Sequence, residues 1–237
     1  MNLAVVTGAS SGIGLAIARM LIDMDYFVYG LSRNPDKAGL PHERYIPYRC
    51  DLRDIDEIMR AAGHIQAYAR ESGHRLGVLV NNAGLAYFAP HEQIGPRQIA
   101  EMIAVNLQAP LILTQQLLRR IKQDKGTIIQ ISSVTAKKSS THGCAYAATK
   151  AGLSHFSLSL FDEIRKTGAR VVSLHPDMTQ TPFYDRLDFR EGEEPDSYIT
   201  PECVADAVRT VLTLREGSVI TDLTIRPQRH QIRRKPR

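Results

Sequence analysis

The sequence predicts an α/β protein in which one doubly wound sheet of about seven parallel strands carries helices on both faces. Two observations lead to this prediction. Short runs rich in β-branched residues alternate along the chain with longer stretches of helical period. The first run passes directly into a glycine-rich turn and then into an amphipathic helix. With 237 residues, the chain has a length that one hydrophobic core can serve, so we expect a single domain over residues 1–237.

Seven runs have the length and composition of strands buried in a parallel sheet. They are Leu3 to Val6, Phe27 to Leu31, a weaker run near Tyr45 to Tyr48, Val78 to Asn81, Thr127 to Ile131, Arg170 to Leu174 and Val219 to Ile225. Between the first two runs, apolar residues from Ile13 to Met24 recur at the spacing of a buried helical stripe. Near the end of the chain, Thr200 and Pro201 suit the start of a helix whose stripe continues from Val204 to Leu212.

The glycine-rich turn after the first strand is suited to binding a pyrophosphate. Glycines permit positive φ and let backbone amides at a helix N-terminus approach phosphate oxygens closely. A tight strand–helix turn without a ligand is the alternative, which the position between strand and helix makes less attractive. The residues that we expect at the cofactor phosphates are Gly8, Ser10, Ser11, Gly12, Ile13 and Gly14.

The end of the second strand favours NADP over NAD as the dinucleotide. In many such folds an acid at this place accepts bonds from the ribose 2′-hydroxyl. Here the run is Leu31-Ser32-Arg33-Asn34, and the first carboxylate is Asp36. A guanidinium such as that of Arg33 binds a 2′-phosphate by charge-assisted bonds. The alternative is that Arg33 is a solvated loop charge and that both cofactors are used.

Tyr146 and Lys150 are one helical turn apart, so on a helix both side chains point to the same side. A free tyrosine has a pKa near ~10, and we expect the adjacent cation and a positively charged nicotinamide to stabilise the phenolate and lower this pKa. An exposed tyrosine beside an exposed lysine is the alternative. The position argues for chemistry, because Ser132 and Ser133 end a predicted strand shortly before Tyr146. We therefore expect an acid/base tyrosine with a lysine helper.

The stretch 183–199 interrupts the regular alternation of strands and helices. Glu191 to Asp196 contains four acids, and four aromatic residues flank them. Ligands of doubly wound sheets lie beyond the carboxyl ends of the strands, where this excursion emerges. The stretch is interpreted as a substrate lid, with a static surface loop as the alternative.

The basic charge of the chain is concentrated at its end. The net charge is +5, but six Lys and Arg residues and no acid lie between Arg226 and Arg237, and the rest of the chain carries 24 basic against 25 acidic residues. A solvated or subunit-contacting tail over residues 228–237 is the expectation. A polyanion-binding arm is the alternative, so nucleic acid is not an expected partner.

Five ordered motifs together resemble the short-chain dehydrogenase/reductase family, from Leu3 to about Pro227. The spacing of the glycine turn is Gly-x-x-x-Gly-x-Gly, and Tyr146 and Lys150 have the spacing Tyr-x-x-x-Lys. The resemblance implies a Rossmann-type fold and hydride transfer between a nicotinamide and a carbonyl or secondary alcohol. It also implies that Ser133 polarises the substrate oxygen, that Tyr146 transfers the proton and that Lys150 binds the nicotinamide ribose. Ser132 is the competing serine.

The resemblance extends to further cofactor contacts. Asp51 and Leu52 match the place where the family holds the adenine, although Asp51 as a plain helix cap is an alternative. The segments that the resemblance places beside the adenosine and the nicotinamide carboxamide comprise Asn82, Ala83, Gly84, Pro176, Met178, Thr179 and Thr181.

Asn106 matches the fourth catalytic residue of the family. Pro110 lies four residues later and has no backbone N–H, so the carbonyl of Asn106 loses its helical partner and the helix should kink. The resemblance implies that this carbonyl holds a water that relays protons from Lys150. A mere packing kink is the alternative.

Asp177 departs from the family pattern, which usually has glycine there, and we expect Asp177 to adopt a left-handed conformation that short polar residues tolerate. His175 is interpreted as a strand-end residue.

The resemblance implies two kinds of partner: a small carbonyl or alcohol substrate and further copies of the chain, as a homodimer or homotetramer. The apolar runs are too short to span a membrane and the N-terminus lacks a signal-peptide pattern, so a cytoplasmic location is expected. Three widely spaced cysteines without histidine clusters predict that the protein has no metal site. A catalytically silent NADP-binding regulatory module and a nucleic-acid-associated protein are the rival functions.

Overall fold

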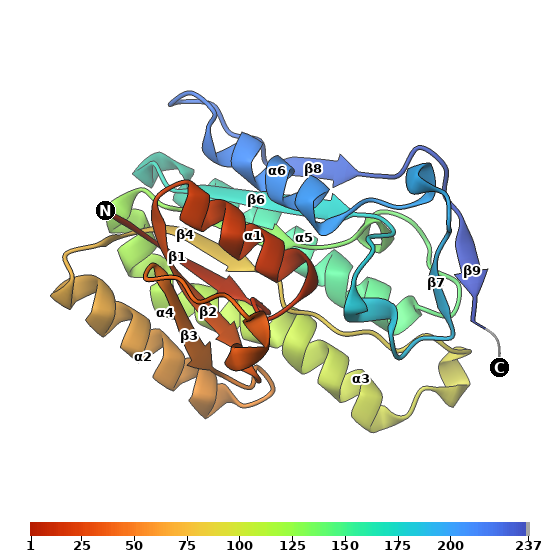
Figure 1. The fold of residues 1–237 in the computed structure, drawn as a ribbon. Helices are drawn as coiled ribbons and strands as arrows, with labels where there is room; N and C mark the ends of the chain where they lie inside the picture. Colours follow the sequence, from red (N-terminus) through yellow and green to blue (C-terminus); the bar gives the residue numbers. More distant parts are fainter. Residues whose placement is uncertain (236–237) are drawn as a thin grey trace.

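The computed structural model describes residues 1–235 and contains one sheet of seven parallel strands (Figure 1). The order of the strands reverses between β1 and β4, which confirms the predicted doubly wound topology. The last strand begins only at Asp222, so the predicted run from Val219 was three residues too long. Across the sheet the strands are β3 (Tyr45–Arg49), β2 (Tyr26–Ser32), β1 (Asn2–Thr7), β4 (Arg75–Asn81), β5 (Thr127–Ile131), β6 (Arg170–Pro176) and β8 (Asp222–Ile225).

Helices cover both faces of this sheet, as predicted (Figure 1). Helices α1 and α6 pack on one face, while α2, α4 and α5 pack on the other. The long helices are α1 (Gly12–Asp23), α2 (Ile55–Glu71), α3 (Pro96–Ile103), α4 (Ala109–Asp124), α5 (Cys144–Ile164) and α6 (Pro201–Leu212). Within the described residues, no helix has the length and apolar character needed to cross a membrane.

Short helical turns connect these elements. A π-helical turn at Ala104–Gln108 joins α3 to α4. The 3₁₀ turns are Pro35–Ala38, His91–Gln93, Val134–Ala136, Arg165–Thr167, Pro182–Tyr184 and Pro195–Ser197.

The alternation of side chains along β1 explains why the core has two halves. Ala4 and Val6 point to the face covered by α1 and α6, whereas Leu3 and Val5 point to the face covered by α2, α4 and α5. All four are fully buried. Truncating a large side chain here, as in Leu3→Ala, is expected to cost ~2–5 kcal/mol of stability.

A second, two-stranded antiparallel sheet lies beyond the end of the main sheet (Figure 1). It pairs β7 (Phe189–Glu191), within the predicted lid, with β9 (Ile232–Arg234), within the basic tail. The sequence does not predict these strands, because three-residue runs are too short to show an alternating pattern. The part of the tail that includes residues 236 and 237 lies outside the described residues.

Candidate active site

The glycine-rich turn has the backbone geometry that the sequence predicts. Gly8 and Gly12 have φ of +67° and +53°, values that other residues rarely adopt. A Cβ at Gly14 would lie 2.3 Å from the Gly8 carbonyl oxygen, so only glycine allows this close approach. Ser11 is the N-cap residue of α1, and its side chain makes no capping bond within the described residues. The first turn of α1 therefore presents backbone N–H groups as a cradle suited to phosphate.

Thr7 ties the end of β1 to the end of β4 beside this turn. Its hydroxyl accepts hydrogen bonds from the backbone N–H groups of Asn82 (2.9 Å) and Ala83 (3.0 Å). The side-chain amide of Asn82 donates to the Thr7 carbonyl oxygen at 2.9 Å. Thr7 is a positioning residue that sequence reasoning missed, and its place directly before the first glycine is the signal that could have revealed it.

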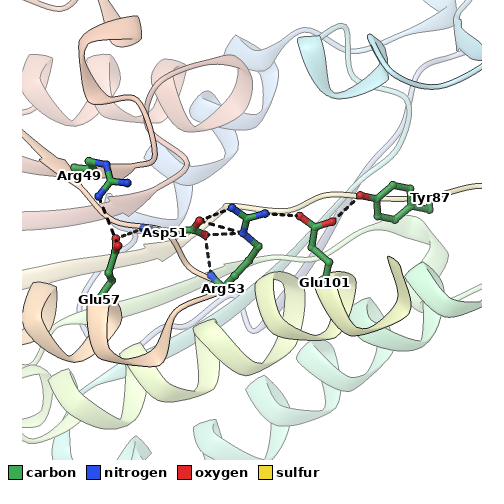
Figure 2. Close-up of polar contacts among 6 residues, drawn as sticks. All are labelled: Arg49, Asp51, Arg53, Glu57, Tyr87 and Glu101. Carbon is green, nitrogen blue, oxygen red and sulfur yellow. Dashed lines mark hydrogen bonds and ion pairs between the residues drawn. The ribbon is translucent and has the colours of Figure 1, made fainter. Parts of the chain in front are cut away.

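Asp51 lies just beyond β3 and is held by Arg53 in a chain of polar contacts (Figure 2). Its carboxylate accepts bonds from the Arg53 guanidinium at 2.5–3.1 Å, and Arg53 also reaches Glu101 at 3.1 Å. The bond from Arg53 is the main reason that the pKa of the Asp51 carboxyl lies below its usual value. Helix α2 is capped by Asp54 instead, so the alternative that Asp51 is a plain helix cap is wrong.

The same chain of contacts continues from Arg53 through Glu101 to Tyr87, in the loop after β4. The Tyr87 hydroxyl donates to Glu101 at 2.6 Å (Figure 2). Leu52, after Asp51, is buried, while Arg33, after β2, is exposed. The Arg33 charge is close enough to contribute to the lowered pKa of Asp51.

Ser133, Tyr146 and Lys150 are brought together in a buried cluster at the carboxyl end of β5. Ser133 follows β5, whereas Tyr146 and Lys150 lie on α5. The Lys150 ammonium donates to the Ile131 carbonyl oxygen at 2.8 Å and lies 5.9 Å from the centroid of the Tyr146 ring. The Ser132 hydroxyl instead bonds to the Lys150 carbonyl oxygen at 3.0 Å. Ser133, by contrast, is close enough to Tyr146 to act on the pKa of its phenol.

Burial dominates the electrostatics of this cluster. It raises the pKa of Tyr146 to about 12, although the interaction with Ser133 acts in the opposite direction. It also lowers the pKa of Lys150 to about 8, because a charged ammonium loses its hydration. In the chain without a cofactor, the cost of desolvating a phenolate thus outweighs the effect of Lys150 on the pKa of Tyr146.

Asn106 lies in the π-helical turn before Pro110. The Ala109 N–H donates to the Ala104 carbonyl oxygen, five residues back, which is the hydrogen bond of a π-helix. The α-helical hydrogen-bond pattern is therefore interrupted directly before Pro110, which has no N–H to donate. The buried Asn106 side chain accepts the Leu85 N–H at 2.9 Å and donates to the Leu85 carbonyl at 2.8 Å. Asn106 thus fixes the loop after β4 through its side chain, which sequence reasoning did not anticipate.

Gly84 brings this loop against the cluster of Ser133, Tyr146 and Lys150. A Cβ at Gly84 would lie 3.4 Å from both Asn106 Oδ1 and Lys150 Nζ. The structure therefore places Asn106 and Lys150 around one glycine of the loop after β4.

The segment after β6, from Asp177 to Thr181, lies against the glycine-rich turn. A Cβ at Gly12 would lie 3.2 Å from Thr181, so this segment lies over the glycine turn. Pro176 ends β6, and Met178 and Thr179 are buried behind it. The segment is therefore close enough to the turn for both to contact one ligand.

Asp177 does not adopt the expected left-handed conformation, since it is not among the described residues with positive φ. Its carboxylate is buried and accepts the Met178 N–H at 3.0 Å. The Asp177 side chain therefore supports the local turn by hydrogen bonding, without a strained backbone.

His175 is a strand-end residue as expected, but it also contacts the backbone of Ser133. Its side chain is fully buried, with Nδ1 at 3.2 Å from the Ser133 carbonyl oxygen and Nε2 at 2.8 Å from Asp222. Burial is the main cause that lowers the pKa of His175. His175 is a second positioning residue that sequence reasoning missed, and its place at the end of the strand next to β5 is the available signal.

Aromatic side chains of the 183–199 segment lie over Tyr146. The centroid of the Phe183 ring is 6.0 Å from that of the Tyr146 ring, and the centroid of the Phe88 ring is 5.6 Å from it. Phe189 in β7 packs edge-on against Phe88 at 5.1 Å. This arrangement is that of a cover over the phenol.

A nucleotide cradle beside a buried Ser–Tyr–Lys cluster, at the switch point of a doubly wound sheet, defines a dinucleotide-dependent oxidoreductase. Within residues 1–235, no cluster of three or more metal-ligating His, Cys, Asp or Glu side chains occurs. The short chain dehydrogenase family model matches residues 2–191. The chain belongs to the short-chain dehydrogenase/reductase family, whose members act on alcohol and carbonyl groups.

Similar proteins support this assignment along the whole chain. Human dehydrogenase/reductase SDR family member 11 is 32% identical over 95% of this chain and 94% of its own length. An alcohol dehydrogenase from Thermococcus sibiricus, solved with 5-hydroxy-NADP, has a TM-score of 0.87 at 26% identity and covers 98% of both chains. A metagenomic short-chain oxidoreductase solved with NADP has a TM-score of 0.79 at 32% identity, covering 96% of this chain and 97% of that one.

Proposed function

We propose that this protein is an NADP(H)-dependent oxidoreductase that interconverts a carbonyl and a secondary alcohol, with Tyr146 as the acid/base group. The observation that carries the proposal is the burial of Ser133, Tyr146 and Lys150 together beside the glycine turn. When bound, the nicotinamide supplies or accepts the hydride, and the protein residues must supply the proton and the orientation.

The residues of the cradle fit a dinucleotide. A side chain at Gly14 would clash with the Gly8 backbone, and Gly8 and Gly12 have positive φ, so the turn can bring its backbone close to a pyrophosphate at the helix N-terminus. Asp51 and Leu52 would hold the adenine, and Lys150 would hold the nicotinamide ribose. The segment from Pro176 to Thr181 would contact the carboxamide.

Tyr146 is protonated at neutral pH because its pKa is raised, so it is ready to donate a proton to a developing alkoxide. Ser133 would donate a second hydrogen bond to the same oxygen. Asn106 would link Lys150 to solvent through its backbone carbonyl, as the π-helical turn before Pro110 permits.

NADP is the proposed cofactor because Arg33 stands where an acid would bind the ribose of NAD. The T. sibiricus alcohol dehydrogenase and the metagenomic oxidoreductase were solved with NADP or a derivative of it, which supports this choice.

The test is NADPH oxidation with a panel of ketones, aldehydes and ketoacyl thioesters. We expect turnover with at least one class and its loss in Tyr146→Phe. Full activity of Tyr146→Phe would overturn the assignment of the proton donor, and NADPH binding without turnover of any carbonyl would favour a silent nucleotide-binding module.

A further inference from the structure

The acidic stretch of the lid and the basic tail pair with each other. Strands β7 and β9 form a ladder in which Arg190 lies opposite Arg233. Arg233 forms an ion pair with Glu193, and the Arg229 guanidinium bonds to Asp196 at 2.6 Å. Arg229 and Arg233, two of the tail cations that suggested a polyanion-binding arm, therefore have partners within the chain.

Lys235 connects the tail to the aromatic part of the lid. Its ammonium donates to the carbonyl oxygens of Tyr184 (2.6 Å) and Asp185 (3.0 Å), and its backbone N–H donates to the Asp188 carbonyl at 2.7 Å. These carbonyls lie at the end of the Pro182–Tyr184 turn and just after it, and this turn carries Phe183, whose ring is near that of Tyr146. Lys235 thus binds the piece of backbone that sets the position of the Phe183 ring.

Asp177 anchors the start of the same C-terminal segment. Its side chain is only 4% exposed and contacts Arg226 Nε at 3.1 Å and His230 Nδ1 at 3.4 Å. The Lys138 ammonium lies 3.8 Å away, on the loop after Ser133. A buried carboxylate is stabilised only when cations or donors surround it, so this contact holds the C-terminal segment against the end of β6.

We propose that residues 226–235 form a clamp that positions an aromatic wall over Tyr146, and that this wall selects carbonyl substrates with an apolar or aromatic substituent. Asp177 anchors the clamp and Lys235 is the positioning residue at its tip. The wall consists of Phe88, Phe183 and Phe189, beside a partly buried apolar cluster that includes Leu85 and Ile99. The proposal rests on the proposed function, because it assigns the substrate class of that same site.

The chemistry of the wall favours this substrate class over a charged one. Aromatic rings offer large apolar contact area and edge-to-face packing to a phenyl or alkyl group. Two of the four acids between Glu191 and Asp196 are paired with the tail: Glu193 with Arg233 and Asp196 with Arg229.

The experiment compares an aryl ketone with a small aliphatic ketone in four enzymes: the wild type, Lys235→Met, Lys235→Arg and Arg234→Met. Arg234 lies in β9 and forms no ion pair among the described residues, so its variant is a control for lost tail charge. Lys235→Met should raise the KM for the aryl ketone at least about ten-fold, the equivalent of one charge-assisted hydrogen bond. Its kcat and its KM for the small ketone should stay near the wild-type values.

Two further measurements distinguish a role of Lys235 in positioning the lid from a general loss of structure. Hydrogen exchange of the Phe189–Glu191 amides should accelerate in Lys235→Met and stay slow in Lys235→Arg and Arg234→Met. NADPH affinity should be unchanged in all variants, because the clamp does not contact the glycine turn within the described residues.

Unchanged selectivity in Lys235→Met would overturn the clamp, whether or not exchange accelerates. A wild-type enzyme that prefers small or anionic carbonyls over aryl ketones would overturn the substrate class. Either result, with Tyr146→Phe inactive, would leave the proposed reaction intact. If every variant lost activity, circular dichroism would show whether the variants are folded. A folded Lys235→Arg enzyme that is as impaired as Lys235→Met would also count against the clamp.

Discussion

Lys150 Nζ lies 5.9 Å from the centroid of the Tyr146 ring, and both side chains are buried. The pKa of the lysine is lowered to about 8 from 10.5, whereas that of the tyrosine is raised to about 12. Both shifts have burial as their main cause, so each group is held toward its neutral form.

This burial predicts that Lys150 lowers the free energy of unfolding by an amount that depends on pH. Because the folded pKa is depressed, charging the lysine destabilises the folded state by about 3 kcal/mol below pH 8. The penalty fades as pH rises from 8 toward 10.5, where the unfolded chain also loses the proton. Lys150→Met should therefore be more stable than the wild type at pH 7, and the difference should shrink by pH 10. Denaturant unfolding at several pH values measures this, with the exposed Lys166→Met as the control, and a constant difference would contradict it.

The raised pKa of Tyr146 predicts opposite pH profiles for the two reaction directions. Carbonyl reduction uses the protonated phenol and should proceed at neutral pH. Alcohol oxidation needs the phenolate, so its rate should increase as pH rises. Initial rates in both directions between pH 6 and 10 provide the measurement. An oxidation rate that falls with pH while the enzyme stays folded would be inconsistent with Tyr146 as the base.

Gly14 and Gly63 form a matched pair that tests the phosphate cradle. A Cβ at Gly14 would lie 2.3 Å from a backbone oxygen, so Gly14→Ala should cost ~1–3 kcal/mol or more of stability and weaken NADPH binding. Gly63 lies in α2 with open space around it, so Gly63→Ala should add up to about 1 kcal/mol of stability. Thermal unfolding and NADPH titration of both variants are the measurements. Equal effects of the two substitutions would show that the cradle geometry is misassigned.

Arg33 is expected to determine cofactor preference. Arg33→Ser should lower kcat/KM for NADPH roughly 10- to 100-fold, the range of one charge-assisted bond to the 2′-phosphate, with little effect on NADH. Arg49 on the neighbouring strand pairs with Glu57 at 3.6 Å, so Arg49→Ser is the control for lost surface charge. Parallel kinetics with both cofactors measure the ratio. A loss shared equally by NADPH and NADH would argue against contact with the 2′-phosphate.

The main sheet and its helices could be predicted because their signals are local. The β-branched runs, the stripe from Ile13 to Met24 and the glycine spacing each lie within a short window. Ser133, Tyr146 and Lys150 could be grouped from the sequence because Tyr146 and Lys150 are one helical turn apart, a strand was expected to end at Ser133, and their spacing resembles that of the family.

Other features depend on contacts between distant segments. The pairing of β7 with β9 joins residues about forty positions apart, and neither strand has a pattern of its own. The pKa of Tyr146 depends on how deeply packing buries it, and the sequence indicated only its neighbour Lys150. Thr7 and His175 act through hydrogen bonds to other strands, which spacing along the chain does not reveal.

The most direct test of the central claim is the transfer of deuterium from [4,4-²H₂]NADPH to a carbonyl substrate, followed by mass spectrometry of the alcohol. Deuterium on the former carbonyl carbon is the predicted result, with the rate reduced about 10²- to 10⁴-fold in Tyr146→Phe. A product alcohol without deuterium at that carbon, or an undiminished rate in Tyr146→Phe, would contradict the account.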